Sequence, residues 1–435
     1  AQGALPVMLA ELGSSTLGST YGGFVDSVTT SGDAKLGLDI TLPLTGSMDG
    51  LAVTGTIALK DNALQVNDTE FGLQHISGRL DFDEQGIRGE QLQGRFFGHP
   101  AVARVWTDNG ATNIRLNGPF DVLDRYVGKD NALGAAISGS SNWRVLVAVN
   151  GMPGRGKQAD VDVTVTSNLV GTRIDLPAPF GKDRDTTRKL TITVDDAVEP
   201  VKTLRIDYGK VLSGLLKIAP EKQGFLLQKG ALATGSTAPV LPAEAVFQVS
   251  GELGRLHVSE WQPHLTGASH AGSKDSPDLP VKLKLHVDEL EVQGYFMDDV
   301  SVDMKSAGNV WDIRADGPSA SGAVRLINGR AGLDKVVMRL DRLVLRSNEQ
   351  PQAGAAGKAT PADFPDLAVS VRRLVYDRAK LGQLELQSLK QPGNKYLVEN
   401  MTLSSKLLDM QLSGSWGIDA GRQLSFIDLQ INRGK

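Results

Sequence analysis

The sequence SNLVGTRIDLPAPFGK, from Ser167 to Lys182, lies between two runs in which apolar and polar residues alternate. The run before it is DVDVTVTS (residues 160–167), and the charged residues DRDTTRK lead from it into the second run, LTITVD (residues 190–195). Pro177 and Pro179 fix their own φ angles and push the residue before each of them out of the α region. Gly181 permits a turn. The stretch therefore predicts a strand, a proline-stiffened loop and another strand.

The same period-two alternation recurs along most of the chain. Its clearest example is residues 281–287, where Val281, Leu283, Leu285 and Val287 alternate with lysine and histidine. Such patterns are typical of strands that bury one face, and we recognise about two dozen of them. Short helices are predicted only at residues 4–12, 119–127 and 256–265. A parallel βαβ sheet needs longer helices between its strands, so the pattern favours antiparallel strands.

Composition narrows the possible functions. Of 435 residues, 40% are hydrophobic, only 5% are aromatic and 49 are glycine, which suits many short strands and turns. The net charge is −4 and no long basic stripe is visible, so binding of nucleic acid is disfavoured. The chain has no cysteine, which excludes disulfides and thiolate metal sites. The longest apolar run, residues 145–149, is far shorter than the roughly 18 residues of a membrane helix.

No motif in the sequence indicates catalysis. GMPGRGK (residues 151–157) matches the GxxxxGK phosphate loop, but Gln158 replaces the magnesium-binding Ser or Thr and a strand pattern follows instead of a helix. A glycine-rich hairpin is the better interpretation. The histidines lack zinc-site spacing, and neither a GxSxG motif nor a cysteine nucleophile is present. We therefore predict a protein that is not an enzyme, with no catalytic residue, cofactor or metal.

Three stretches carry a resemblance to a known family. They are SNLVGTRIDLPAPFGK, then GELGRLHVSEWQPHL (residues 251–265), and residues 364–414 with LVYDRAKLGQLELQS and LSGSW. Together they resemble the YhdP subgroup of the AsmA-like bacterial envelope proteins. The resemblance implies an all-β fold, namely an elongated, curled antiparallel sheet with an open apolar groove and a few short helices. It also implies that this chain is a piece of a longer periplasmic protein anchored in the inner membrane, and that both of its ends are cut.

The function implied by this resemblance is lipid transfer. Members move glycerophospholipids between the inner and outer membranes and support the outer-membrane barrier. The expected partners are phospholipids, whose acyl chains would lie in the groove, and the two membranes, which would be reached by parts outside this chain. Binding of nucleic acid is not expected.

The following division of the chain is expected. It comprises an N-terminal helix and loop (1–30), a groove segment (31–150), a groove segment with the LPAPFGK loop (151–250), a short helix and loop (251–280), a groove segment (281–347), a flexible linker (348–362) that should tolerate deletion, and a last groove segment (363–435).

The alternating residues are the candidates for the groove lining. They are Leu36, Leu38, Ile40, Leu42, Val53, Ile57, Leu59, Leu190, Ile192, Val194, Val281, Leu283, Leu285, Val287, Val369 and Val371. Alternation alone is better explained by a closed β-sandwich core of a structural or adhesive protein; the resemblance favours an acyl-chain surface. A carbohydrate-active enzyme on a β scaffold is a further alternative, disfavoured by the low aromatic content.

Overall fold

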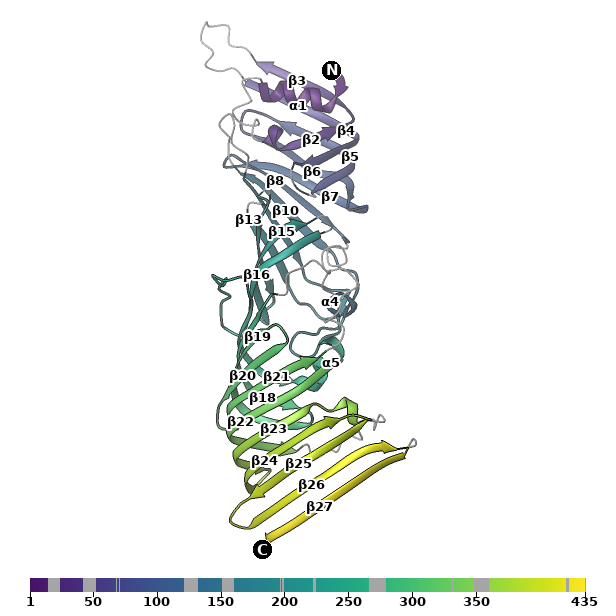
Figure 1. Ribbon diagram of the computed structural model, residues 1–435. Coiled ribbons are helices and arrows are strands. Elements are labelled where there is room, and N and C mark those ends of the chain that lie inside the picture. Colours follow the sequence, from purple (N-terminus) through teal and green to yellow (C-terminus); the bar gives the residue numbers. More distant parts are fainter. Residues whose placement is uncertain are drawn as a thin grey trace. The chain divides into compact units, whose positions relative to one another are not determined.

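A computed structural model describes most of the chain. The residues it leaves undescribed are 15–23, 42–51, 68, 70, 121–131, 151–159, 196, 198, 222–223, 266–278, 330–331, 348–359, 420–421 and 435. Leu42, the GxxxxGK match and most of the predicted helix at 119–127 and of the predicted linker therefore lie outside the described residues. The described chain packs as two compact units (Figure 1). Unit 1 comprises residues 1–176 and 180–228, and unit 2 comprises residues 229–435 together with 177–179.

Unit 1 is an antiparallel sheet with short helices. Its elements are β1 (Gln2–Ala4), α1 (Leu5–Ser14), β2 (Val28–Ser31), β3 (Asp33–Thr41), β4 (Ala52–Val66), β5 (Gly72–Phe82), β6 (Ile87–Phe96), β7 (His99–Asp108), β8 (Ala111–Gly118), α4 (Ala132–Ala135), β9 (Ile137–Gly139), β10 (Trp143–Asn150), β11 (Asp160–Ser167), β12 (Thr172–Ile174), β13 (Leu190–Asp195), β14 (Lys202–Tyr208) and β15 (Leu212–Glu221). Neighbours along the chain pair from β3 to β8, β8 then pairs with β10, and the sheet continues through β11, β13, β14 and β15. Strands β9 and β12 form a separate pair.

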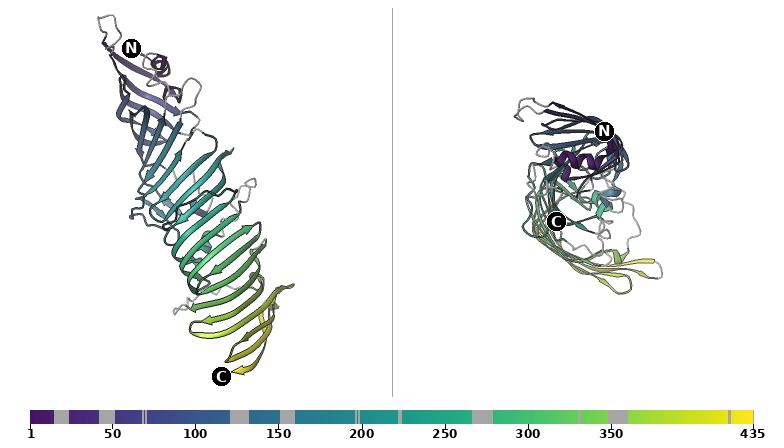
Figure 2. Two further views of the ribbon diagram at one scale, coloured as in Figure 1. Left: turned by 90° about the vertical axis from the view of Figure 1, so that its left-hand side faces the viewer. Right: turned by 90° about the horizontal axis from the view of Figure 1, so that it is seen from above.

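Unit 2 is also mostly strand. Its elements are β16 (Gly224–Thr234, which begins before the unit boundary), β17 (Phe247–His257), α5 (Val258–Leu265), β18 (Val281–Val292), β19 (Tyr295–Ala307), β20 (Val310–Asp316), β21 (Ala320–Gly329), β22 (Gly332–Ser347), the 3-10 turn η2 (Pro361–Asp363), β23 (Asp366–Tyr376), β24 (Ala379–Gln391), β25 (Lys395–Ser404), β26 (Leu408–Asp419) and β27 (Arg422–Gly434). Figure 2 shows that this sheet curls across its strands. The predicted all-β fold with few short helices is confirmed, and none of the helices in the described ranges is long and apolar enough to cross a membrane.

The expectation of purely antiparallel pairing is wrong for unit 2, whose sheet is mixed. Strands β16, β17 and β18 pair in parallel, and so do β22 and β23. The chain returns between β17 and β18 through α5, whereas residues 235–246 lead from β16 to β17 with no described helix. A parallel connection therefore does not require the long helix assumed from sequence.

The parallel pairing of β22 and β23 determines the distance that the predicted linker has to span. Asp366, at the start of β23, lies beside Lys335, whereas β22 ends at Ser347. Ser347 and Asp366 therefore lie twelve residues apart along β22, which is about 40 Å of strand. Most of the linker lies outside the described residues, and its tolerance of deletion stays a prediction that this distance constrains.

Lys182, the last residue of the LPAPFGK loop, is anchored in unit 1 by hydrogen bonds. Lys182 and Ile174 exchange two backbone hydrogen bonds of 2.9 Å each. The Lys182 side chain is buried, and its Nζ donates to the carbonyl oxygens of Leu169, Thr172 and Asp183 at 2.8, 2.6 and 2.7 Å. Burial lowers the pKa of this ammonium, and the neighbouring Arg188 lowers it further. The predicted loop between two strands is thus an anchored structure.

Candidate functional site

The strands of unit 2 align one apolar side chain after another on a single face. Residues that face each other across neighbouring strands share a face of the sheet, so the register can be followed from strand to strand. The resulting apolar row has one residue on each of the twelve strands from β16 to β27. Its members are Leu232, Val249, Leu283, Met304, Ile313, Val324, Met338, Val369, Leu386, Met401, Leu412 and Leu429.

A second row runs beside it, two residues away along each strand. It consists of Leu285, Val302, Ala315, Gly322, Leu340, Val371, Leu384, Leu403, Met410 and Ile431. Several of its members are well buried, with Leu340 5% and Val371 0% exposed. These two pack with Leu374 and Leu403 into a small cluster that also contacts Met338 and Val369 of the apolar row.

The other face of the same strands is polar. The opposite row consists of Ser250, Lys284, Asp303, Arg314, Ala323, Arg339, Ser370, Glu385, Thr402, Gln411 and Gln430, and alanine is its single apolar member. Unit 2 therefore separates apolar from polar side chains across the sheet over eleven strands in succession.

The apolar row is neither buried nor fully exposed. Every member from Leu232 to Leu412 is half-buried, and Leu429, on the last strand, is 49% exposed. In a closed sandwich the second sheet would cover such a row, and its side chains would be almost fully buried. The described part of unit 2 thus leaves apolar surface in contact with solvent along the whole row.

Unit 1 differs, because its apolar face is covered. Val145, Val147, Val161 and Val163 on β10 and β11 are between 0% and 2% exposed. They belong to one cluster that also contains Leu5 and Leu9 of α1 and Leu169, which follows β11, together with buried residues of β4 to β8. This arrangement is a packed core.

The sequence candidates divide between these two environments. In unit 1, Ile57, Leu59 and Leu190 are buried in the core, Leu36, Val53, Ile192 and Val194 are half-buried, and Leu38 and Ile40 are about half exposed at 53% and 52%. In unit 2, Leu283 and Val369 lie in the apolar row, Leu285 and Val371 in the second row, Val281 is half-buried and Val287 is fully buried. Their role as a groove lining remains a prediction.

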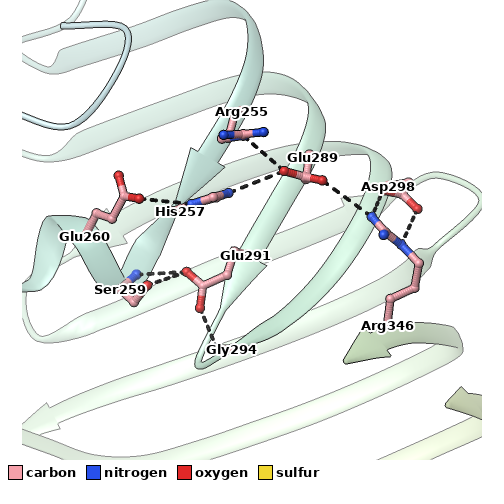
Figure 3. A network of polar contacts seen from close by, with 9 residues as sticks. All are labelled: Arg255, His257, Ser259, Glu260, Glu289, Glu291, Gly294, Asp298 and Arg346. Carbon is pink, nitrogen blue, oxygen red and sulfur yellow. Dashed lines mark hydrogen bonds and ion pairs between the residues drawn. The ribbon is translucent and has the colours of Figure 1, made fainter. Parts of the chain in front are cut away.

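Unit 2 also holds a charged network, which sequence reasoning missed (Figure 3). Its members are Arg255, His257, Glu260, Glu289, Asp298 and Arg346. The carboxylate of Glu289 lies 3.1 Å from Arg255 Nε, 3.4 Å from His257 Nε2 and 3.6 Å from Arg346 Nη2. Arg346 also forms a bidentate contact with the carboxylate of Asp298. His257 Nδ1 lies 3.1 Å from the carboxylate of Glu260. No short sequence motif could have shown this, because its residues come from four strands and a helix.

A separate contact ties the start of α5 to the sheet. The buried carboxylate of Glu291 accepts hydrogen bonds from the hydroxyl and backbone N–H of Ser259 and from the backbone N–H of Gly294 (Figure 3). Burial alone would raise the pKa of Glu291, but these hydrogen bonds outweigh it and hold the pKa below its usual value. Among the described residues, no group of three or more His, Cys, Asp or Glu is placed to hold a metal ion.

Comparison with known proteins agrees with the features above. A curated relative is the intermembrane phospholipid transporter YhdP of Escherichia coli (strain K12), 24% identical over 183 residues. The match covers 41% of this chain and only 14% of that protein. No solved structure matches the chain. The model of the YhdP protein family matches residues 1–434, so the chain belongs to this family.

Proposed function

We propose that the apolar face of unit 2 carries the acyl chains of glycerophospholipids, and that the chain is a periplasmic segment of a conduit between the inner and outer membranes. The observation that supports this most is the apolar row, which is only half-buried and is in register across twelve strands. Each methylene that leaves water for such a surface gains about 0.8 kcal/mol. Partition of lipid, with no covalent chemistry, then suffices for the function.

Several further features support the proposal. The E. coli relative is named as an intermembrane phospholipid transporter. An uncovered apolar strip of this length is unusual for a soluble monomer and is typical of surfaces that bind a partner. The polar opposite row keeps the outside of the sheet in water. By extension, the full-length protein supports the outer-membrane barrier and is anchored in the inner membrane.

Site-specific photocrosslinking tests the proposal at neighbouring positions. Met401 lies in the apolar row and Thr402 in the opposite row, both are on β25, and both are half-buried. A photoreactive amino acid at either position should perturb the fold equally. After expression in a Gram-negative host and irradiation, mass spectrometry should find phospholipid attached at position 401 and not at 402. Adducts at neither position, or equally at both, would contradict the proposal.

A further inference from the structure

The apolar face of unit 2 ends at the same level on three neighbouring strands. Leu253, Val287 and Val300 face one another across β17, β18 and β19, and they are 7%, 0% and 0% exposed. Two residues further along, Arg255, Glu289 and Asp298 face one another in the same way. Side chains two residues apart on a strand share a face and lie about 6.7 Å apart. The face therefore changes from buried apolar to charged within one step.

The charges at this boundary alternate in sign. Arg255 and Arg346 flank the Glu289 carboxylate, and Arg346 continues to Asp298 (Figure 3). The side chains of Arg255, Arg346 and Asp298 are 65%, 47% and 51% exposed, so these charged groups are accessible to water. With Glu260 included, three carboxylates face two guanidinium groups and one histidine.

We propose that the charged network is a binding site for a zwitterionic headgroup, which carries a phosphate and an ammonium. This proposal rests on the proposed function, because it requires acyl chains on the neighbouring apolar face. A lipid lying there must place its polar end at the margin of that face, where the network is. Arg255 and Arg346 are suited to the phosphate, since guanidinium groups bind phosphate oxygens in pairs. Asp298 and Glu260 are suited to the ammonium.

The balance of charge makes the site selective. The two arginines and three carboxylates of the network together carry a charge of −1. A headgroup that carries both signs finds a partner for each charge. A headgroup with only a negative charge meets the same arginines but also the excess of carboxylates, and like charges placed side by side disfavour binding. The site should therefore favour phosphatidylethanolamine over phosphatidylglycerol.

A competition experiment tests the selectivity. The purified full chain is incubated with vesicles of equal parts phosphatidylethanolamine and phosphatidylglycerol and reisolated, and mass spectrometry then measures the bound lipids. The wild type should be enriched in phosphatidylethanolamine. The double variant Glu260→Gln/Asp298→Asn, which makes the network positive, should lower the ratio of phosphatidylethanolamine to phosphatidylglycerol by about two- to fivefold, the size expected for solvent-exposed charge pairs.

A matched control changes the net charge by the same amount on the polar face of the sheet. Asp303→Asn/Asp316→Asn alters two exposed aspartates that share the polar face of β19 and β20, and its lipid ratio should equal that of the wild type. Arg255→Gln, at a largely exposed position, should retain less of both lipids while its melting temperature is unchanged. A ratio that is the same in the network variant, the control and the wild type would overturn the headgroup site and leave the conduit standing.

Two other outcomes would also overturn the headgroup site. A wild-type chain that takes up no lipid would refute it together with the conduit. Titration with water-soluble glycerophosphoethanolamine distinguishes a lipid headgroup from a free phosphoester. If the soluble compound binds the wild type and Arg255→Gln weakens it, while the lipid ratios stay equal in all variants, then the network binds a free metabolite and the lipid assignment fails.

Discussion

At the scale of single residues, Lys182 shows what local sequence could not predict. Lysine is almost never fully buried without a partner, and the sequence shows only that Gly181 permits a turn here. In the structure Lys182 is 7% exposed, and its ammonium donates to three backbone carbonyl oxygens. The acceptors Leu169 and Thr172 lie more than nine residues upstream, so the contact depends on how the loop folds back. Sequence predicted the loop but not the group that anchors it.

Removing this anchor should destabilise unit 1. Lys182→Ala removes a buried donor that three carbonyl oxygens share. The oxygens of Leu169 and Asp183 keep the N–H groups of Thr172 and Thr186 as donors, so we expect the free energy of unfolding to fall by roughly 1–3 kcal/mol. Lys189→Ala, at an exposed lysine of the same loop, is the control and should have little effect. Urea denaturation of both variants measures the difference. Equal stabilities would show that the Lys182 contacts contribute nothing.

Glu291 should make unit 2 sensitive to acid. Its pKa in the folded chain lies below the ordinary value of 4.5, so it contributes stability above that pH, and the contribution is lost as the pH falls through the folded pKa. The melting temperature of the wild type should therefore decline more steeply between about pH 5 and pH 3 than that of Glu291→Gln. The exposed Glu399→Gln variant should keep the wild-type slope, and a parallel decline in all three would contradict the assignment.

Leu285 is a test of packing and not of lipid access. It is only 5% exposed and belongs to the second row, so Leu285→Asp would bury a carboxylate with or without lipid and should cost several kcal/mol. Lys284→Gln, on the opposite face of the same strand, should be neutral. The melting temperatures of the two variants test this prediction. A small effect of Leu285→Asp would show that this part of the sheet opens to water.

At the scale of elements, the sequence predicted strands well and their arrangement poorly. Alternation at residues 281–287 fixes which side chains of β18 share a face, and the strand is there. Alternation says nothing about which residue of the next strand lies opposite, however. The apolar row depends on that register, and members such as Met304 and Ile313 were therefore missed. The parallel pair of β16 and β17 was missed because residues 235–246 form no helix that would signal a crossover. The pair of β17 and β18 was missed because the helix predicted at 256–265 was not recognised as part of a crossover.

The crossover between β22 and β23 should depend on length and not on composition. Deleting residues 348–359 leaves six residues between Ser347 and Asp366, which reach at most about 25 Å and fall short of the return path along β22. This deletion should lower the melting temperature of unit 2 sharply. Replacing the same residues by an equal number of glycines and serines should be tolerated, as should the loss of four residues. A stable full deletion would refute the parallel pairing.

At the scale of the whole molecule, the two units differ in how they treat their apolar residues. Unit 1 packs many of them into a buried core with Leu5 and Leu9 of α1 and with Leu169, whereas unit 2 leaves its apolar row only half-buried. A ligand that binds only the folded form stabilises the unit that binds it. The contrast therefore predicts which unit responds to lipid.

Calorimetry of the delipidated chain should separate these responses. We expect the addition of phospholipid to raise the melting transition of unit 2 and to leave that of unit 1 unchanged. The Lys182→Ala variant identifies the unit 1 transition, because it should shift only that one. A lipid-induced shift of the unit 1 transition alone, or of neither, would contradict the placement of the lipid surface in unit 2.

The apolar row has a consequence for the direction of transport. Neighbouring strands are about 4.8 Å apart, so under the proposed function a lipid on this face would advance in steps of that size, and each step would take it from one aliphatic or thioether side chain to another. The free energy of the lipid would rise and fall slightly between neighbouring strands but would show no overall trend along the row. Nothing in the row distinguishes forward from backward, so net flux would follow the difference in chemical potential between the two ends and would reverse whenever that difference changes sign.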